Sequence, residues 1–290
     1  MSIKLIINPN AGKGSASKKS QSVIAELKKR NVDFDYELTN APREAVGIAR
    51  EASGKFEKIV AVGGDGTINE VGEGLVESDS IFCVIPLGSG NDFAKELKIP
   101  SKVNAAVDLL LKGSVRTIDV IKVNDRISLN TAGVGFNALV SNSVTQIKYL
   151  RGLSVYIWGV VKSAVRYEAI PMKIVINDKL IEEKIFMVAI CNSKREGGGF
   201  IVAPEAINDD GLFDVTFIRE IGYLKLLLNI SSALNGKLNK LDEVETIRSD
   251  KITIESEFPM PLHVDGEVVS MNSKYVEASI LKGALRVIGN

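Results

Sequence analysis

The chain has 290 residues, 45% hydrophobic and 25% charged, which supplies a large core and is the composition of a globular protein. Lysine plus arginine equals aspartate plus glutamate, at 36 each, and this balance argues against a nucleic-acid-binding protein. Cys83 and Cys191 lie far apart in the sequence, which excludes a disulfide framework and the usual spacing of zinc ligands. The length favours two domains.

The chain begins with a strand-like segment and a turn, without the pattern of a signal peptide. Its longest apolar run, residues 153–161, is too short to cross a bilayer. We therefore expect a cytoplasmic protein that associates at most peripherally with the inner face of the membrane.

The first part of the chain alternates strand-like and helix-like segments, which is typical of a parallel sheet covered by helices on both faces. Strands are expected at residues 3–8, 34–38, 59–62 and 82–85, and helices at 17–30, 45–52, 67–76 and 103–111. The pattern predicts an α/β N-terminal domain with a parallel sheet.

Beyond about residue 115 the pattern changes to short alternating strands separated by turns, which predicts a C-terminal antiparallel β-sandwich domain. Strands are expected at 116–123, 127–131, 172–176, 185–192, 212–218, 251–255, 275–280 and 285–288, and helices at 144–165 and 223–234. We expect a first domain at residues 1–122 and a β-rich second domain at 123–290, whose last strand is able to return to the first domain.

The first domain is organised around Gly-Gly-Asp-Gly-Thr, residues 63–67. This segment follows a buried strand and, with Thr67 as N-cap and Glu70 three residues later, precedes a helix. Backbone N–H groups and the positive end of a helix dipole hold phosphate at such a turn. Because Asp65 would repel a bare phosphate, we infer a Mg²⁺-nucleotide. The alternative is an ordinary tight turn in which Asp65 bonds its own backbone.

Three further turns follow predicted parallel strands, so four turns meet at the edge of the sheet where open α/β sheets bind ligands. The first, residues 8–15, offers glycines and Lys13 but has neither P-loop nor dinucleotide-fingerprint spacing. Thr39 ends the second strand, and Pro-Leu-Gly-Ser-Gly-Asn-Asp-Phe, residues 86–93, follows the fourth. The convergence of four turns is a stronger signal than any one of them.

The Asn-Pro pair at residues 8–9, the Gly-Gly-Asp-Gly-Thr turn and the segment 86–94 together resemble the diacylglycerol kinase catalytic-domain family, which includes bacterial lipid kinases and sphingosine kinases. Phosphofructokinases and NAD kinases are more distant relatives with the same glycine turn. Ser89 stands where the family more often has threonine, and it keeps the hydroxyl. The resemblance implies that ATP, with Mg²⁺, binds at Asn8, Pro9, Asn10, Ala11, Gly12, Thr39, Gly63, Gly64, Asp65, Gly66, Thr67, Ile68, Asn69, Glu70, Ser89 and Asn91.

A carboxylate-rich turn in the second domain, residues 204–214, suits a hard cation. In the bacterial members that the chain resembles, this loop holds a largely structural Mg²⁺, which implies Asp210 and the carbonyls of Ile207 and Leu212 as ligands. The relative with an acid at the Ile207 position uses that side chain, whereas only the carbonyl is available here. The alternative is a solvated Asp-Gly hairpin turn.

The segment His-Val-Asp-Gly-Glu, residues 263–267, lies at the end of a late strand. Carboxylates two residues apart project to the same side of an extended chain, unless the glycine between them bends it. Spacing alone favours a surface turn, whereas the resemblance implies the catalytic segment. Asp265 and Glu267 would then orient and deprotonate the lipid hydroxyl, either one taking the proton, and Asp65 would act with the catalytic Mg²⁺.

Other segments have simpler explanations beside functional ones. His263 is expected to be structural. Lys194 and Arg195, before the glycines at 197–199, would contact phosphate or anionic lipid, or form a solvated loop. The patterns at 153–161 and 223–234 suit interfacial helices, but we favour the reading in which they cover the β-domain core.

We therefore expect an ATP-dependent lipid kinase at a membrane surface, with diacylglycerol, converted to phosphatidic acid, as the favoured substrate. The alternatives are a kinase for phosphatidylglycerol or a sphingoid base, an NAD kinase, and a regulator that binds nucleotide or lipid without turnover. The Asn-Asp-Phe at 91–93 and the Asp-Gly-Glu at 265–267 argue against an NAD kinase. Edge strands of the second domain are also able to pair in a homodimer.

Overall fold

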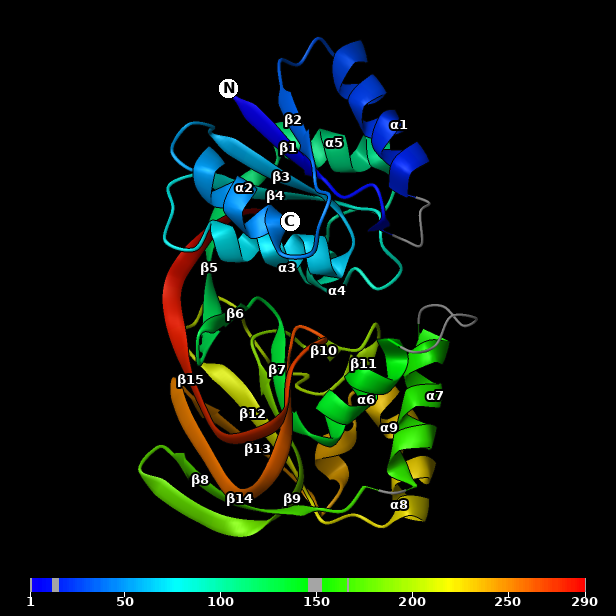
Figure 1. The fold of residues 1–290 in the computed structure, drawn as a ribbon, viewed down its shortest axis with the longest axis vertical. Helices are drawn as coiled ribbons and strands as arrows, with labels where there is room; N and C mark the ends of the chain where they lie inside the picture. Colours follow the sequence, from blue (N-terminus) through cyan, green and yellow to red (C-terminus); the bar gives the residue numbers. More distant parts are fainter. Residues whose placement is uncertain (1, 12–15, 146–152, 166, 290) are drawn as a thin grey trace. The chain divides into compact units, whose positions relative to one another are not determined.

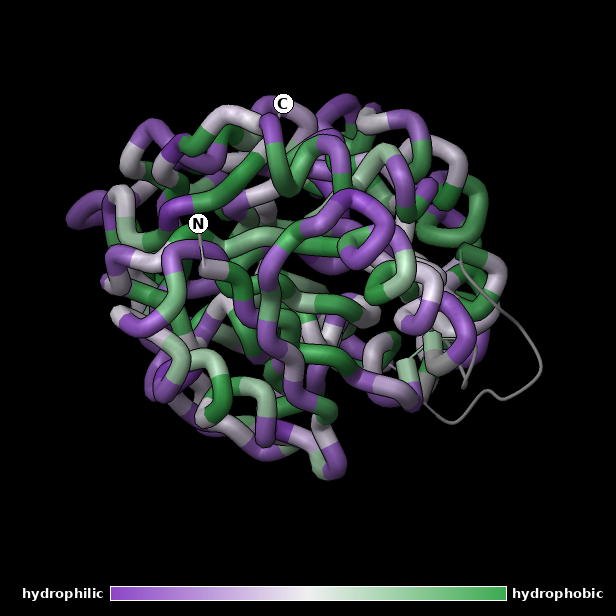
Figure 2. The backbone as a smooth tube through the Cα atoms, turned by 90° about the horizontal axis from the view of Figure 1, so that it is seen from above, coloured by the Kyte–Doolittle hydropathy of each residue, from purple (hydrophilic) through white to green (hydrophobic). Residues whose placement is uncertain are grey.

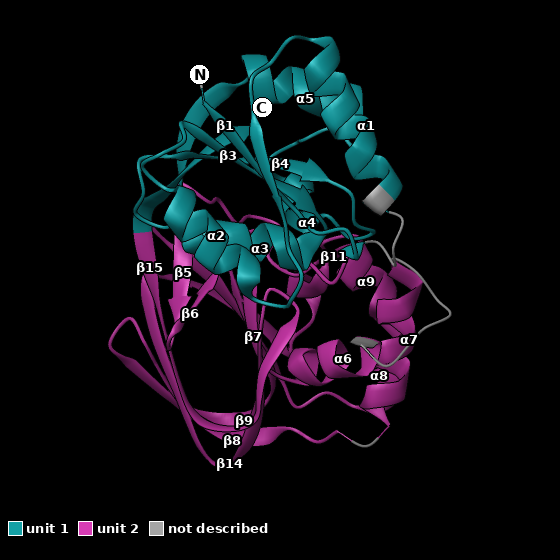
Figure 3. Ribbon diagram, turned by 45° about the horizontal axis from the view of Figure 1, so that its top comes forward, with its two compact units in different colours: residues 1–119, 282–290 teal, residues 120–281 magenta. Residues whose placement is uncertain are grey.

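The computed structural model describes residues 2–11, 16–145, 153–165 and 167–289. The chain divides into two compact units, coloured separately in Figure 3. Unit 1 consists of Met1–Asp119 and Lys282–Asn290, and unit 2 of Val120–Leu281. The long last strand, β15 (Glu267–Gly289), therefore starts in unit 2 and ends in unit 1.

Unit 1 is built on a parallel sheet in the order β2, β1, β3, β4. Its strands are β1 (Ile3–Ile7), β2 (Asp35–Leu38), β3 (Lys58–Gly63) and β4 (Ile81–Pro86). Every residue of β1, β3 and β4 is buried, as expected for strands covered on both faces. The end of β15 extends the sheet, with Val287 opposite Phe82 of β4.

Helices cover both faces of this sheet: Figure 1 shows α1 and α5 on one face and α2 and α3 on the other. The helices of unit 1 are α1 (Ala16–Lys29), α2 (Glu44–Ala52), α3 (Asp65–Gly74), α4 (Asp92–Glu96) and α5 (Val103–Lys112). Because β2 and β3 lie on opposite sides of β1, the strand order reverses between β1 and β3. Open α/β sheets bind their ligands at the carboxyl ends of the strands beside such a reversal.

Unit 2 is dominated by antiparallel strands. They are β5 (Ser114–Val123), which begins in unit 1, β6 (Arg126–Ser128), β7 (Thr131–Gly135), β8 (Ile170–Ile176), β9 (Lys179–Cys191), β12 (Phe213–Arg219), β13 (Val244–Ser249) and β14 (Lys251–Val264). The first half of β9 pairs with β8, and the second half with β7 and β12. In the same way β14 pairs first with β8 and then with β7. A separate hairpin is formed by β10 (Arg195–Glu196) and β11 (Phe200–Ile201).

Alternate residues of the unit 2 strands face two apolar clusters. Val188 and Ile190 of β9 join a cluster formed by strands alone, whereas Ala189 and Cys191 face a second cluster that includes helices. The helices of unit 2 are α6 (Phe136–Thr145), α7 (Leu153–Ala164), α8 (Tyr223–Leu228), α9 (Ile230–Leu234) and the short 3-10 helix η2 (Leu238–Lys240). The second cluster places these helices on one outer face of the strands.

Several predicted boundaries in unit 2 are wrong. The helical pattern at 144–165 spans the end of α6 and all of α7, and that at 223–234 is two short helices. The strand expected at 251–255 continues to Val264, and the segments 275–280 and 285–288 are parts of β15. The long strands persist because β14 and β15 find new partners along their length, which local periodicity does not reveal.

Hydrophobic residues concentrate on the inner strands, and hydrophilic residues on the outer turns and helix faces (Figure 2). Among the described residues, no helix combines the length and the apolar character needed to cross a membrane.

Candidate active site

The turns after the four parallel strands lie at one edge of the unit 1 sheet, because paired parallel strands end on the same side. The segment 8–11 follows β1, Thr39 follows β2, the segment 63–70 ends β3 and begins α3, and the segment 87–91 follows β4. The structure thus gathers the predicted nucleotide-binding residues at this edge. Gly12 and Lys13 are outside the described residues.

Asn8 joins three parts of this edge. Its backbone N–H donates to the Val62 carbonyl of β3 at 3.1 Å, and its side-chain amide donates to the Thr67 hydroxyl at 3.0 Å. Its side-chain oxygen accepts the N–H of Asn10 at 2.9 Å. The Asn-Pro turn is therefore tied to the turn after β3, at the reversal of strand order.

Asp65 joins the two glycine turns. One carboxylate oxygen accepts the N–H of Asn91 and the other that of Asp92, each at 2.8 Å. Burial, and secondarily the nearby Asp92 carboxylate, raise the pKa of the Asp65 carboxyl above its ordinary value. Asp65 bonds the backbone of the other turn, so the simple alternative of a self-contained turn does not describe it.

The two turns approach each other at main-chain distance. A Cβ on Gly88 would lie 2.7 Å from the Cα of Gly64, and one on Gly90 would lie 2.6 Å from a carboxylate oxygen of Asp65. A side chain on Gly88 would require backbone movement, and one on Gly90 would displace the Asp65 carboxylate. The glycines are therefore required for the contact between the turns, in addition to any role toward a ligand.

The predicted capping box is wrong. The N-cap of α3 is Gly64, so Thr67 lies within the first turn of the helix. Thr67 accepts the hydrogen bond from Asn8, and Glu70 accepts the N–H of Ala45 at the start of α2 at 3.2 Å. The N-cap of α3 therefore lies three residues earlier than the capping sequence indicates, and the Asp65 side chain at the first helical position bonds the other glycine turn.

The remaining predicted residues at this edge differ in exposure. Ser89 is exposed at the tip of the second glycine turn. Asn91 adopts a left-handed conformation, with φ of 53°, and its amide donates to the Gly88 carbonyl at 3.0 Å. Thr39 is buried, and its N–H donates to the Ile7 carbonyl at 2.9 Å. Ser89 therefore presents the accessible hydroxyl of the set.

In unit 2, Asp265 and Gly266 form the two-residue turn between β14 and β15. Both have positive φ, 48° and 82°, and Val264 pairs with Glu267 across the turn. This is the geometry for which Asp-Gly is preferred in hairpins. The glycine bends the chain, so the two carboxylates have separate surroundings.

The Asp265 carboxylate is held by four donors from one segment. One oxygen accepts the Ser128 hydroxyl and the N–H groups of Asn130 and Thr131, each at 2.9 Å, and the other accepts the N–H of Leu129 at 2.7 Å. Burial raises the pKa of the Asp265 carboxyl, and these hydrogen bonds act in the opposite direction. The side chain thereby fixes the turn to the start of β7.

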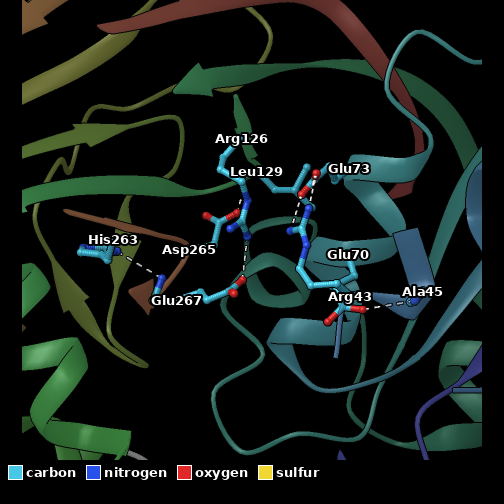
Figure 4. A network of polar contacts seen from close by, with 10 residues as sticks. Arg43, Ala45, Glu70, Glu73, Arg126, Leu129, His263, Asp265 and Glu267 are labelled. Carbon is cyan, nitrogen blue, oxygen red and sulfur yellow. Dashed lines mark hydrogen bonds and ion pairs between the residues drawn. The ribbon is translucent and has the colours of Figure 1, made fainter. Parts of the chain in front are cut away.

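Glu267 lies in a more open position. Its side chain is 55% exposed, and one carboxylate oxygen lies 2.7 Å from the guanidinium of Arg126 (Figure 4). Figure 4 shows the Arg126 side chain directed toward the same turn that carries Asp265. Arg126 and Ser128 lie in the segment 124–129, which carries no motif from which their contacts could be predicted.

An apolar cavity of about 100 Å³ lies in unit 2 between the strands and the covering helices. Its walls come mainly from α6, α7, α8, α9 and β11, and include Phe136, Val140, Phe200, Leu226 and Ile230. Glu196 is the one acidic residue in the lining. A cavity of this kind suits part of a hydrocarbon chain.

The helices over this cavity keep apolar side chains on their outer surface. Trp158 of α7 is 53% exposed, and Leu224 and Leu228 of α8 are 72% and 79% exposed. The inner faces of α7 and α8 line the cavity. Covering the core therefore explains the apolar residues on the inner face of each helix, but not those on its outer face.

The carboxylate-rich loop of unit 2, residues 204–214, is already paired with the basic side chain of Arg248 from β13. Asp210 accepts hydrogen bonds from the Arg248 guanidinium and, at 3.1 Å, from the N–H of Leu212. The Ile207 side chain is exposed, and in the part of the chain that the structure describes no three Asp, Glu, His or Cys side chains gather as a metal site. Arg248 thus already neutralises the Asp210 carboxylate, and the Mg²⁺ site at Asp210 and the carbonyls of Ile207 and Leu212 stays a prediction. No catalytic step depends on a metal at this loop.

Both parts of the chain match models of known protein families. Residues 2–123 match the model of the diacylglycerol kinase catalytic domain, and residues 130–289 match that of the YegS C-terminal NAD kinase beta sandwich-like domain. A diacylglycerol kinase of Mycobacterium tuberculosis is 28% identical over 87% of this chain and 84% of its own length. The "Probable lipid kinase YegS-like" protein of Chromohalobacter salexigens is 30% identical over 97% of this chain and 91% of its own length.

Solved structures agree on the fold. A crystal structure of a diacylglycerol kinase from Bacillus anthracis matches with a TM-score of 0.77 at 24% identity, over 100% of this chain and 97% of that chain. The predicted combination of a catalytic domain with a C-terminal β-sandwich-like domain is confirmed by the matched models. The chain belongs to the diacylglycerol kinase catalytic-domain family, and it is a lipid kinase.

Proposed function

We propose that the protein transfers the γ-phosphate of ATP to a lipid hydroxyl, with diacylglycerol as substrate and phosphatidic acid as product. The observation that carries this proposal is the bridge from Asp65 to the backbone of the second glycine turn, at the reversal of strand order. Relatives named diacylglycerol kinase, from Mycobacterium tuberculosis and Bacillus subtilis, support the choice of lipid.

ATP would bind at the carboxyl edge of the unit 1 sheet. The N-terminus of α3 has free N–H groups for phosphate, and the glycines leave its main chain accessible. Each Asp65 oxygen accepts one N–H and keeps a further lone pair, so Asp65 is able to hold the Mg²⁺ that accompanies ATP, directly or through water. When bound there, Mg²⁺ would supply positive charge beside the phosphates.

Glu267 is the proposed base for the lipid hydroxyl, and Asp265 is the residue that holds the turn. As the hydroxyl oxygen forms its bond to the γ-phosphorus, the bond to the bridging oxygen of ADP breaks and Glu267 takes the hydroxyl proton. This assignment follows from the open carboxylate of Glu267 and the four donors on Asp265. The reaction requires the hydroxyl and the γ-phosphate to approach to about 3–3.5 Å.

The acyl chains would come from a membrane and enter the apolar cavity of unit 2. The cavity lies under α7 and α8, and the exposed Trp158, Leu224 and Leu228 are the groups that would enter the interfacial region of a bilayer. Peripheral association through this surface predicts that replacing both leucines by serine reduces sedimentation with vesicles. Activity on a short-chain soluble diacylglycerol should persist in that variant.

The decisive experiment incubates the purified protein with labelled ATP, Mg²⁺, NAD and mixed micelles of diacylglycerol, phosphatidylglycerol or a sphingoid base. Label in phosphatidic acid would support the proposal in full, and label in another lipid would retain the mechanism and change the substrate. Label in NAD alone would favour an NAD kinase. ATP binding without release of ADP in any mixture would favour a regulator.

A further inference from the structure

The single histidine of the chain, His263, lies two residues before the proposed catalytic turn and is completely buried. A lone histidine beside apolar residues is expected to have only a structural role. Its two ring nitrogens, however, face two groups of different kinds: a backbone N–H of the turn and a carboxylate from the hairpin β10–β11. The contact with the turn is a hydrogen bond, whereas the contact with the carboxylate is a close approach of opposite polarity without hydrogen-bond alignment.

The first contact defines the proton on the ring. The N–H of Gly266 donates to Nδ1 of His263 at 3.2 Å. Nδ1 is therefore unprotonated, and the proton of the neutral ring is on Nε2. Gly266 is the residue between Asp265 and Glu267, so this bond holds the centre of the turn.

The second contact is with Glu196. Its Oε1 lies 2.8 Å from Nε2 of His263, and its side chain is 13% exposed. The two atoms are close but are not aligned as a hydrogen bond, and Nε2 has no hydrogen-bond partner among the described residues. A carboxylate beside Nε2 nevertheless favours, by its charge, the tautomer with the proton on that nitrogen, which is the tautomer that the Gly266 bond requires. Glu196 also lines the apolar cavity, so the network of Glu196, His263 and Gly266 runs from the cavity wall to the turn.

The neighbouring main chain leaves room for this ring. A Cβ on Gly133 of β7 would lie 2.2 Å from Nε2 of His263 and 2.0 Å from the side-chain nitrogen of Asn137. On the other side of Glu196, a Cβ on Gly197 would lie 3.0 Å from the ring of Tyr156. Gly133 and Gly197, which have no side chains, thus leave the space that the side chains of His263 and Tyr156 occupy.

We propose that His263 is a positioning residue for phosphoryl transfer: it fixes the backbone of Gly266, and through it the origin of Glu267, while the nearby Glu196 carboxylate favours the tautomer of the ring that accepts the Gly266 N–H. The inference rests on the proposed function, because it assumes that Glu267 acts on the lipid hydroxyl. It adds that the wall of the lipid cavity and the catalytic turn are joined through one side chain.

The first test is independent of activity. Because the chain has one histidine, incorporation of ¹⁵N-imidazole histidine gives one set of ring signals. The expected spectrum shows protonated Nε2 and unprotonated Nδ1, together with a coupling or shift that connects Nδ1 to the Gly266 amide. A proton on Nδ1 would overturn the geometry of the proposal.

The second test uses substitutions that each keep half of the ring's contacts. In His263→Asn the amide oxygen replaces Nδ1 as acceptor for Gly266, and in His263→Gln the amide nitrogen replaces Nε2 as donor to Glu196. We expect His263→Asn to keep kcat within about threefold of wild type. We expect His263→Gln to lower kcat about 10- to 100-fold, the scale of a small misplacement of a reacting group. KM for ATP should not change in either.

Glu196→Gln should lower kcat less than His263→Gln, and the matched control is Glu245→Gln, an exposed glutamate of unit 2 that pairs with Arg219. Melting temperatures give the fraction of folded protein and so separate positioning from stability. A purely structural role predicts that kcat per folded molecule is equal in His263→Asn and His263→Gln, and that outcome would overturn the proposal.

A wild-type protein that phosphorylates no lipid would overturn the proposed function and the kinetic role of His263 with it. The ring spectrum would still test the geometry.

Discussion

Asp65 of unit 1 and Asp265 of unit 2 each stand in an Asp-Gly pair, and each uses both carboxylate oxygens to hold the backbone of another segment. Asp65 accepts two N–H groups, whereas Asp265 accepts three N–H groups and a hydroxyl. The difference separates an acid with one hydrogen bond on each oxygen from an acid with three hydrogen bonds on one oxygen and one on the other. Glu267, next to the second pair, has the open carboxylate that Asp265 lacks.

The comparison assigns the largest effect to Glu267. Replacing it by alanine should lower kcat by at least about 100-fold, the usual scale for an acid–base group, because Asp265 is not free to take over. The fold should persist, since Glu267 is 55% exposed and loses only the ion pair with Arg126. Steady-state kinetics and a melting curve check this. Glu257→Ala, an exposed acid on β14, is the control and should keep full activity.

Asp65→Ala should also reduce activity by at least about 100-fold, because it removes a charge from the proposed ATP–Mg²⁺ site. Unlike the Glu267 variant, it should also weaken ATP binding, since the N–H groups of Asn91 and Asp92 lose their acceptor. Calorimetric titration with ATP distinguishes the two variants. The control is Asp33→Ala, at an exposed aspartate of unit 1, which should keep full activity. Near-wild-type turnover in Asp65→Ala would contradict the role assigned to Asp65.

Asp265 should instead show its effect in stability. Asparagine at this position offers one acceptor oxygen to four donors, and unsatisfied buried groups cost about 1–3 kcal/mol each. We expect Asp265→Asn to lower the free energy of unfolding by about 3 kcal/mol, measured with urea. If instead stability is unchanged and kcat falls as far as in Glu267→Ala, the distinction between the two acids is wrong.

A third acid in a glycine turn, Asp210, extends the comparison to a carboxylate that has a cation as partner. Because Arg248 occupies that position, chelation of divalent ions should leave the melting temperature unchanged within about 1 °C. Arg248→Ala should lower it by a few degrees, about 1 kcal/mol for a partly exposed pair. A melting temperature that rises with Mg²⁺ in the wild-type protein would show instead that the loop binds the metal.

The turns that form the candidate site could be predicted from the sequence, whereas several of their hydrogen bonds could not. The four turns after β1, β2, β3 and β4 were found because a parallel sheet places the ends of its strands together, which follows from strand order alone. The cap of α3 was misplaced because Asp65 bonds a turn 26 residues later, and a local capping rule does not include such a partner.

The second domain shows the same limit. From their spacing, Asp265 and Glu267 were expected to point to the same side of the chain. The positive φ of Asp265 and Gly266 turns the chain, so the two carboxylates have different surroundings. Arg126 and Glu196 carried no motif, and they acquire their positions from pairing between distant strands and from the β10–β11 hairpin. Contacts across 141 residues, as between Arg126 and Glu267, are set by topology and not by spacing.

The cysteines provide the last and smallest test, because Cys83 lies in unit 1 and Cys191 in unit 2. Both are buried, so a thiol reagent at pH 8 should label each only as its own unit opens, and mass spectrometry would show which unit opens first. Equal labelling rates at the two sites would mean that the units open together.

Burial raises the pKa of the Cys83 thiol from 9.0 to about 12. The unfolded chain therefore loses this proton first, and the stability of unit 1 should fall as the pH rises from 9 toward 12, by at most about 1.4 kcal/mol per pH unit from this group. Cys83→Ala should remove that part of the slope in urea unfolding and leave the contributions of lysine and tyrosine. An unchanged slope in the variant would show that the Cys83 thiol is accessible to solvent in the folded protein.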